Sequence, residues 1–209
     1  MAESVPLGFL NRSVPSGSHV CVFYSDSAGR DEILMPFLAH GLRTGQKCIC
    51  VLASLGPGEV AARLGHHVGL DLPVETSQLE LATPAETYLR SGRFSAEEML
   101  AYWQDAATAA QTANFGVARA AGEMPRELDH GGRRDFMKYE ASLTESVSSL
   151  PEVIICLYDL RLSGAEVLMD VLRTHPLTVV DGVIHDNPYH VPLGPFLSST
   201  GGADGRQPA

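Results

Sequence analysis

Short apolar runs alternate with helical segments along most of this chain, and this alternation constrains the fold more than any other feature. The most apolar run is 153–158 (VIICLY), which ends at Asp159. A strand that is apolar on both faces must be covered by helices on both sides, as in the middle of a parallel sheet. The other runs are 19–24 (HVCVFY), 47–53 (KCICVLA), 78–82 and 115–121 (FGVARAA). Strands separated by helices predict a layered α/β domain with a mostly parallel central sheet and helices on both faces.

Helices are predicted between these runs from apolar spacing and from capping residues. Segment 31–42 repeats apolar residues at helical spacing, with Pro36 expected in its first turn or at a kink. Further helices are expected from Pro57 and over 135–147. A Ser or Thr followed three residues later by Glu predicts a helix start, because each side chain caps a backbone amide of the other. The three pairs of this kind are Thr83/Glu86, Ser95/Glu98 and Ser163/Glu166.

The two ends of the chain differ from its middle. Asp181-Gly182 lies between two short apolar runs and predicts an antiparallel hairpin at the C-terminal edge of the sheet. The last twelve or so residues are rich in Gly, Ser and polar side chains and are expected to be disordered. We therefore divide the chain into an N-terminal extension (1–17), one domain (18–196) and a disordered tail (197–209).

Charge and composition narrow the classes of function. The formal net charge of −10 would repel nucleic-acid phosphates and anionic lipid, so we expect no direct contact with either. No run approaches the roughly 18 apolar residues of a membrane span, and the N-terminus lacks a basic secretory segment, which predicts a cytoplasmic protein. All four cysteines lie in apolar runs without a recognised metal-ligand spacing. We interpret them as buried thiols and predict no metal site, with a zinc or redox site as the alternative.

The turn after the first long apolar run resembles an altered phosphate-binding loop. Segment 24–31 (YSDSAGRD) places Gly29 and Arg30 where the motif Gly-x-x-x-x-Gly-Lys-Ser/Thr has its second glycine and its lysine. Tyr24 replaces the first glycine, whose small size lets backbone amides wrap the phosphates. Asp31 replaces the hydroxyl that holds magnesium.

Carboxylates around this turn weigh against nucleotide binding. Asp26 and Asp31 would both repel a triphosphate. Asp159, at the end of a strand, matches the acidic residue that supports the metal in ATPases of this kind. The scaffold therefore resembles a RecA-like ATPase whose phosphate site is degenerate, and we expect neither ATP hydrolysis nor a bound nucleotide cofactor.

Seven short segments, in their order and spacing, resemble the MEDS domain, a methanogen/methylotroph sensory domain with a divergent RecA/KaiC-like fold. They are 19–24 (HVCVFY), 37–45 (FLAHGLRTG), 122–124 (GEM), 139–140 (YE), 156–159 (CLYD), 173–176 (RTHP) and 187–189 (NPY). The resemblance implies a sensor of small organic molecules, proposed for the family to be hydrocarbon derivatives, with no catalytic residues to carry over. Relatives that repress transcription add a DNA-binding helix-turn-helix. Only seventeen residues precede the predicted domain and a short polar tail follows it, which leaves no room for that motif. We therefore expect the domain to signal in trans, through a separate protein.

Candidate binding residues follow the strands, because ligands of open α/β sheets bind beyond the carboxyl ends of parallel strands. We expect Tyr24, Glu123, Asp159 and Arg161 to share one cleft, although buried carboxylates are as often structural. Arg119 lies inside a strand and is expected to face a carboxylate such as Glu140 or Asp159, while His175 enters only through the family resemblance. The candidates are Tyr24, Ser25, Asp26, Arg30, Arg119, Glu123, Asp159, Arg161 and His175.

These observations favour a non-catalytic sensory module that binds a small organic ligand. Its expected partner is a separate signalling protein, such as a histidine kinase, an anti-sigma-type regulator or a transcription factor, and a homo-oligomer is compatible with this role. One alternative is a residual nucleotide-binding ATPase in which Arg30 and Asp159 keep partial roles. The other is a protein-interaction module without a ligand. A serine hydrolase is not supported, because the sequence has no Gly-x-Ser-x-Gly motif.

Overall fold

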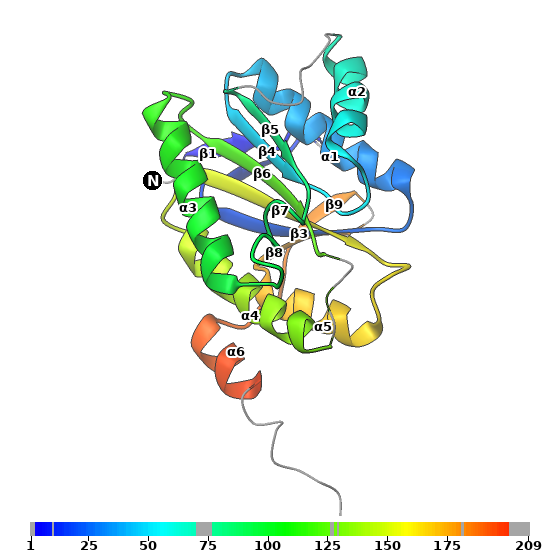
Figure 1. The fold of residues 1–209 in the computed structure, drawn as a ribbon, viewed down its shortest axis with the longest axis vertical. Helices are drawn as coiled ribbons and strands as arrows, with labels where there is room; N and C mark the ends of the chain where they lie inside the picture. The colour runs from blue at the N-terminus through cyan, green and yellow to red at the C-terminus, as the bar shows by residue number, and fades with distance from the viewer. Residues whose placement is uncertain are drawn as a thin grey trace, which may run out of the picture.

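A mostly parallel sheet forms the centre of the protein, as predicted (Figure 1). The computed structural model describes residues 3–9, 11–69, 77–125, 128, 130–180 and 182–200. Within these residues seven strands form one sheet in the order β5-β4-β6-β7-β3-β8-β9, in which β9 alone pairs antiparallel. The strands are β3 (Ser18–Tyr24), β4 (Lys47–Val51), β5 (Leu79–Ala82), β6 (Ala118–Glu123), β7 (Glu152–Asp159), β8 (Leu177–Val180) and β9 (Val183–Asp186).

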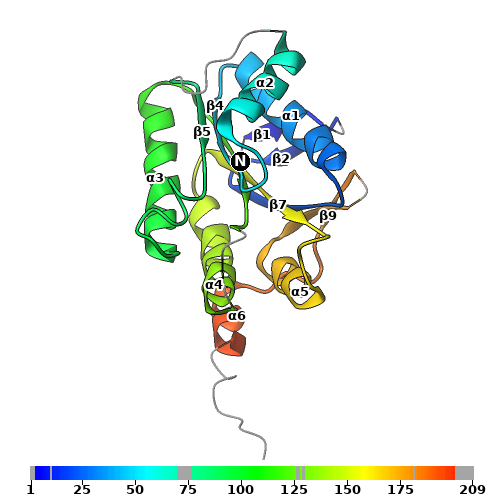
Figure 2. The same cartoon turned by 45° about the vertical axis from the view of Figure 1, so that its right-hand side comes forward.

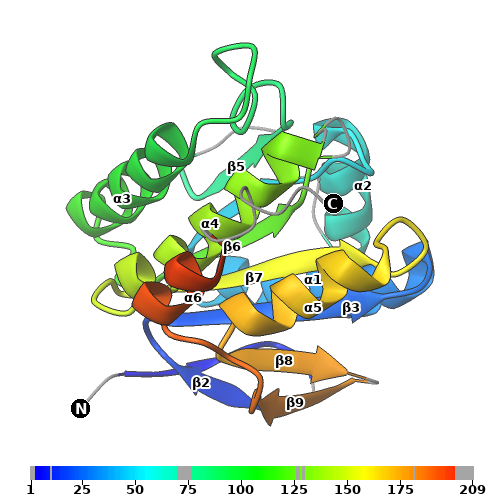
Figure 3. The same cartoon turned by 90° about the horizontal axis from the view of Figure 1, so that it is seen from below.

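Helices cover both faces of the sheet, also as predicted (Figure 2). One apolar core lies under α1 (Ser27–Arg43) and α2 (Pro57–Val68). A second core lies on the opposite face, under α3 (Ala96–Thr112) and α4 (His130–Val147). The same face carries α5 (Ala165–Thr174) and α6 (Leu193–Thr200), which Figure 3 shows beside α4. No helix of the described residues has the length and apolar character needed to cross a membrane.

Strand β7 has the central position that its sequence predicts. All eight of its residues are buried, and it pairs with β3 on one side and β6 on the other. The neighbouring β6 starts at Ala118, three residues later than predicted. Asn114 and Gly116 have positive φ values of 62° and 71°, which interrupt an extended strand. The predicted strand 115–121 is therefore corrected to 118–123.

The helix starts test the capping predictions. Ser95 accepts a hydrogen bond from the amide of Glu98 at 3.3 Å and begins α3, as predicted. The Glu86 carboxylate accepts a hydrogen bond from the amide of Thr83 at 2.8 Å, but turns rather than an α-helix follow it. The Thr83 hydroxyl also donates to the Glu86 carboxylate, at 2.7 Å, so only the Glu86 half of the capping pair forms, and it forms without the helix.

Two helix starts differ from the prediction. Helix α5 begins after Gly164, so Ser163 is not its cap. Helix α1 begins at Ser27, because the side chain of Asp26 caps it, four residues earlier than predicted. Pro36 therefore lies in the middle of α1 rather than in its first turn.

The regions that flank the predicted domain contain regular structure. Strands β1 (Ser4–Pro6) and β2 (Ser13–Pro15) form a hairpin inside the predicted N-terminal extension, with Val5 and Val14 in the core. Helix α6 includes residues 197–200 of the predicted tail, and 201–209 lie outside the described residues. The β8–β9 hairpin confirms the predicted antiparallel edge, although Asp181 of its turn is outside the described residues.

Candidate functional site

A cavity of about 220 Å³ lies at the carboxyl ends of β3, β6 and β7. Tyr24, Glu123 and Asp159 all line it, so the strand ends bring these three side chains together as the topology predicts. Part of the wall comes from α4 and α5. Its apolar lining consists of Met124, Pro125, Leu128, Leu157, Leu162 and Val167, and its polar lining also includes Arg133, Tyr158 and Ser163.

The Glu123 carboxylate forms part of the cavity wall and is fully hydrogen bonded. Its Oε1 accepts hydrogen bonds from the Tyr24 hydroxyl at 2.8 Å and the Ser54 hydroxyl at 2.6 Å. Its Oε2 accepts hydrogen bonds from the backbone amides of Ala53 and Ser54 at 2.9 and 2.7 Å. Because a carboxylate has about four acceptor sites, Glu123 holds β3, β6 and the segment after β4 together. Burial, with the Glu123 charge, raises the pKa of Tyr24 well above its usual range.

Asp159 is paired with Arg161 at the rim of the cavity. Arg161 donates from Nη2 to Oδ2 at 2.7 Å and from Nε to Oδ1 at 3.0 Å, and its backbone amide donates to Oδ1 at 2.9 Å. The hydrogen bonds with Asp159 raise the pKa of Arg161. The Arg161 side chain is 59% exposed and is not part of the cavity lining, so the prediction that it lines the same cleft as Tyr24 was wrong.

The turn that resembles a phosphate loop builds the start of α1. Asp26 Oδ1 accepts a hydrogen bond from the amide of Gly29 at 2.8 Å, and Ser25 beside it is exposed. The Asp26 carboxylate therefore accepts the hydrogen bond of a helix N-terminal amide that could otherwise bind a phosphate. Neither Ser25 nor Asp26 lines the cavity.

Arg30 is also separate from the cavity. Its guanidinium donates to Asp31 Oδ1 at 2.7 and 2.9 Å and to the Ser54 hydroxyl at 2.7 Å. Only 3% of Arg30 is exposed. The residue at the position of the phosphate-binding lysine thus links α1 to the segment after β4.

Arg119 lies in the core on the α1 face of the sheet, and the prediction of a carboxylate partner was wrong. Its guanidinium donates to the carbonyl oxygens of Pro6 and Phe37 and to the Gln46 side chain. It also lies 5.0 Å from the centroid of the Phe37 ring. Burial lowers the pKa of Arg119 to about 10. Arg119 fastens the β1–β2 hairpin to the sheet and does not reach the cavity.

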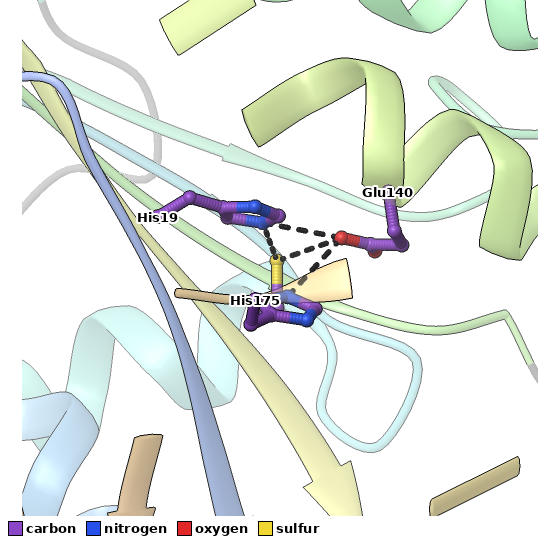
Figure 4. Close-up of side chains that lie close together, drawn as sticks. His19, Glu140 and His175 are labelled. Carbon is purple, nitrogen blue, oxygen red and sulfur yellow. Dashed lines mark hydrogen bonds and ion pairs between the residues drawn. The ribbon is translucent and has the colours of Figure 1, made fainter. Parts of the chain in front are cut away.

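His175 belongs to a second, fully buried group on the α4 face, together with His19, Glu140 and Cys156 (Figure 4). His19 lies on β3, Glu140 on α4, Cys156 on β7, and His175 directly after α5. Their potential ligand atoms all lie within 4.8 Å of one another. His175 therefore lies apart from Tyr24 and Asp159, because none of these four side chains lines the cavity.

Burial and mutual contact perturb the ionisable residues of this group. Burial, with the nearby His175, lowers the pKa of His19 to about 4. Burial alone would raise the pKa of Glu140, but the contacts with His175 and His19 hold it at about 2. The Glu140 carboxylate is therefore ionised at neutral pH.

Sequence reasoning did not find this group, because its members have no local spacing. His19 and Cys156 are 137 residues apart, and Cys156 and Glu140 are 16 apart. One signal was available. Each of the four residues lies in a different one of the segments that carry the MEDS resemblance, namely HVCVFY, YE, CLYD and RTHP.

Comparisons with known proteins agree with this architecture. The family model of the MEthanogen/methylotroph, DcmR Sensory domain (MEDS) matches residues 18–176. The transcriptional repressor DcmR of Methylorubrum extorquens (strain DSM 6343 / CIP 106787 / DM4) is 25% identical over 160 residues, which cover 75% of this chain and 57% of the repressor. The chain thus spans little more than half the length of that relative.

A solved structure with a similar fold is that of a KaiC-like protein from the hyperthermophilic archaeon Pyrococcus horikoshii OT3. The TM-score is 0.58 and the sequence identity 13%, and the match covers 85% of this chain and 80% of the other. At this identity the likeness concerns the fold alone, and it agrees with the predicted KaiC-like fold.

Proposed function

The chain belongs to the MEDS family of sensory domains, and from this premise we propose that it is a non-catalytic sensor of a small organic molecule. The proposed binding site is the cavity at the carboxyl ends of β3, β6 and β7. The observation that carries the proposal is the composition of its wall, in which apolar side chains are combined with a few polar ones.

The cavity suits an organic ligand in size and chemistry. Its volume of about 220 Å³ is far larger than the roughly 10–15 Å³ that a single buried water requires. Leu128, Leu157 and Val167 offer apolar contacts, while Tyr24 and Ser163 carry hydroxyl groups. Apolar pockets with a few placed polar groups are typical of small-molecule sites. We therefore propose a ligand with an apolar body and one polar end, such as a hydrocarbon derivative.

The carboxylates of the cavity support binding rather than catalysis. A general base must have an acceptor available to the proton that it removes. The four acceptor sites of Glu123 are occupied by protein donors, and Asp159 is held by Arg161. These contacts favour a preformed pocket over an acid–base centre.

A signal from the cavity has a short path to the surface. Leu162 and Val167 line the cavity from the β7–α5 connection and from α5. Leu160, Leu162 and Met169, in the same part of the chain, are exposed by 42%, 60% and 52%. We propose that ligand binding shifts this apolar surface and that a separate regulatory protein reads the change. The coupling requires that the ligand bind the two shapes unequally.

The first experiment tests the cavity. Small molecules released by denaturing the purified native protein are identified by mass spectrometry, and a released compound is titrated back by calorimetry. If nothing is released, short-chain alcohols and halogenated hydrocarbons serve as probes. Val167→Trp should fill the cavity and weaken binding at least about tenfold, or 1.4 kcal/mol. The control, Met169→Trp, places the same side chain on the exposed side of α5 and should bind normally.

Two outcomes would contradict the proposal. Equal affinity of the two tryptophan variants would place the ligand elsewhere. Micromolar binding of Mg-ATP that disappears in Arg30→Ala would favour the residual nucleotide-binding alternative. Signalling in trans is tested separately, by whether a candidate kinase or regulator binds the chain differently with and without the identified compound.

A further inference from the structure

The four atoms that meet in the buried group are metal ligands by type. They are Nε2 of His19, Nε2 of His175, one carboxylate oxygen of Glu140 and the sulfur of Cys156. Glu140 Oε2 lies 3.1 Å from His19 Nε2, 3.3 Å from His175 Nε2 and 3.6 Å from Cys156 Sγ. The His19 Nε2 to Cys156 Sγ distance is 3.1 Å. Figure 4 shows the side chains converging from different elements on one point.

These separations are close to the edges of a tetrahedral zinc site. Zinc bonds of about 2.0–2.1 Å to nitrogen or oxygen and about 2.3 Å to sulfur give ligand-to-ligand distances of about 3.3–3.6 Å. The contacts of Glu140 already lie near this range. A bound ion would widen the contact between His19 and Cys156 by about 0.4 Å, which a small side-chain rotation achieves.

The hydrogen bonds of His19 fix its tautomer. Thr144 donates its hydroxyl proton to a carbonyl oxygen, that of Thr174 at 2.7 Å. The same hydroxyl lies 2.8 Å from His19 Nδ1 and can therefore only accept a hydrogen bond there. The proton of the neutral His19 ring is thus on Nδ1. Its Nε2 directs a lone pair toward Glu140 and Cys156.

The hydrogen bonds of His175 lead to the same tautomer. Its Nδ1 lies 2.8 Å from the carbonyl oxygen of Val171, which can only accept. The proton is again on Nδ1, and Nε2 has no hydrogen-bond partner among the described residues. A histidine whose Nδ1 is held by a protein acceptor, with Nε2 left bare, is the usual arrangement of a metal ligand.

In the metal-free protein two protons can pair these four atoms, namely the Cys156 thiol proton and one proton shared between Glu140 and an imidazole Nε2. A divalent ion would replace both protons and bind all four atoms. With the Cys156 thiolate and the Glu140 carboxylate, its charge of +2 gives a neutral site, which a fully buried position strongly favours.

We propose that His19, Glu140, Cys156 and His175 form a tetrahedral Zn²⁺ site that joins β3, α4, β7 and the segment after α5. A borderline ion such as zinc suits this mixture of imidazole, thiolate and carboxylate ligands better than calcium or magnesium, which prefer oxygen. Four protein ligands close the coordination shell, as in structural sites. The site goes beyond the proposed function, because it shares no residue with the ligand cavity.

The test measures metal in the full chain. Protein produced in zinc-supplemented medium and purified without chelator should contain about one zinc ion per chain, as measured by elemental mass spectrometry. Cys156→Ser should reduce the zinc content to about a tenth or less. Cys21→Ser is the matched control, since Cys21 pairs with Cys156 in the sheet and is equally buried but does not belong to the group. It should retain the zinc.

A second measurement keeps the proposal testable if Cys156→Ser does not fold. Replacing zinc with Co²⁺ in the unmodified chain should produce the d–d absorption of tetrahedral cobalt and a thiolate-to-cobalt charge-transfer band. X-ray absorption at the zinc edge should show one sulfur at about 2.3 Å and three lighter ligands at about 2.0–2.1 Å. Val167→Trp in the ligand cavity should leave the zinc content unchanged.

Two results would overturn the proposal. One is an unmodified chain that binds less than about a tenth of an equivalent of zinc, both as purified and after dialysis against zinc. The other is a folded Cys156→Ser variant that keeps as much zinc as Cys21→Ser.

Discussion

Two buried glutamates, Glu123 and Glu140, differ in what surrounds their carboxylates. Glu123 at the strand ends receives hydrogen bonds from hydroxyl and amide donors of the chain. Glu140 on the α4 face meets two imidazole nitrogens and a thiol, which are all metal ligands by type. Burial alone therefore does not mark a binding atom. The carboxylate of Glu123, saturated by protein donors, forms part of the wall of the proposed ligand pocket, whereas the carboxylate of Glu140 is a ligand of the zinc site that we propose.

The largest effect is expected at Glu140. Glu140→Gln removes the negative charge between His19 and His175 and a proposed zinc ligand. Breaking a buried charged group typically costs about 3–5 kcal/mol, so the free energy of unfolding in urea should fall by about that amount. Glu145→Gln, an exposed position on the same helix, is the control and should change little. A Glu140→Gln variant as stable as this control would contradict the claim that the Glu140 charge holds the buried group together.

Glu152, at the start of β7, is a third buried glutamate, and its surroundings differ from those of Glu123 and Glu140. Neither of its oxygens has a hydrogen-bond partner among the described residues, and burial raises its pKa to about 8. The folded protein then keeps a proton that the unfolded chain releases above about pH 4.5. Stability should therefore fall as pH rises from about 4.5 to 8 and level off above that.

Glu152→Gln should remove this dependence and stabilise the protein by a few kcal/mol at pH 9. Urea unfolding at pH 5, 7 and 9 measures it, with the exposed Glu59→Gln as the control. An unchanged slope of stability against pH would show that Glu152 is ionised or solvated in the folded protein.

A smaller loss is expected when the saturated carboxylate is changed. Glu123→Gln turns an amide NH₂ group toward donors that now lack an acceptor, which typically costs about 1–3 kcal/mol. The zinc content should stay at the level of the unmodified chain, because Glu123 does not belong to the buried group. Loss of zinc in a folded Glu123→Gln variant would mean that the two regions are coupled.

The smallest change concerns Tyr24. Tyr24→Phe removes one of the four hydrogen bonds of Glu123 and should lower the free energy of unfolding by about 0.5–1.5 kcal/mol. Tyr189→Phe, at a residue that is 61% exposed, is the control and should have no measurable effect. If ligand affinity also falls in Tyr24→Phe, its hydroxyl contacts the ligand in addition to Glu123.

Much of the fold could be predicted where a local pattern decides the structure. The apolar run of β7, the Ser95 cap and the β8–β9 hairpin each depend on neighbouring residues. The errors arose where other parts of the chain compete. Glu86 caps the amide of Thr83 without a helix, and Arg119 binds carbonyl oxygens of the β1–β2 hairpin and α1 instead of a carboxylate.

The candidate sites show the same division. The meeting of Tyr24, Glu123 and Asp159 could be predicted, because parallel strands bring their carboxyl ends to one edge whatever their distance in the sequence. That these residues bind a ligand stays a prediction. Arg30 and Asp26 were assigned to the same site, but the structure uses them to build the start of α1.

Local sequence patterns predict the alternation of strands and helices, the central place of β7 and the family to which the chain belongs. The convergence of His19, Glu140, Cys156 and His175 on one buried point depends on how distant elements pack together. Periodicity reports which face of an element is apolar, but it does not say how far along a strand a side chain lies opposite a given turn of the covering helix. That register depends on the packing of α4 and α5 against β3 and β7, which involves residues more than a hundred positions apart.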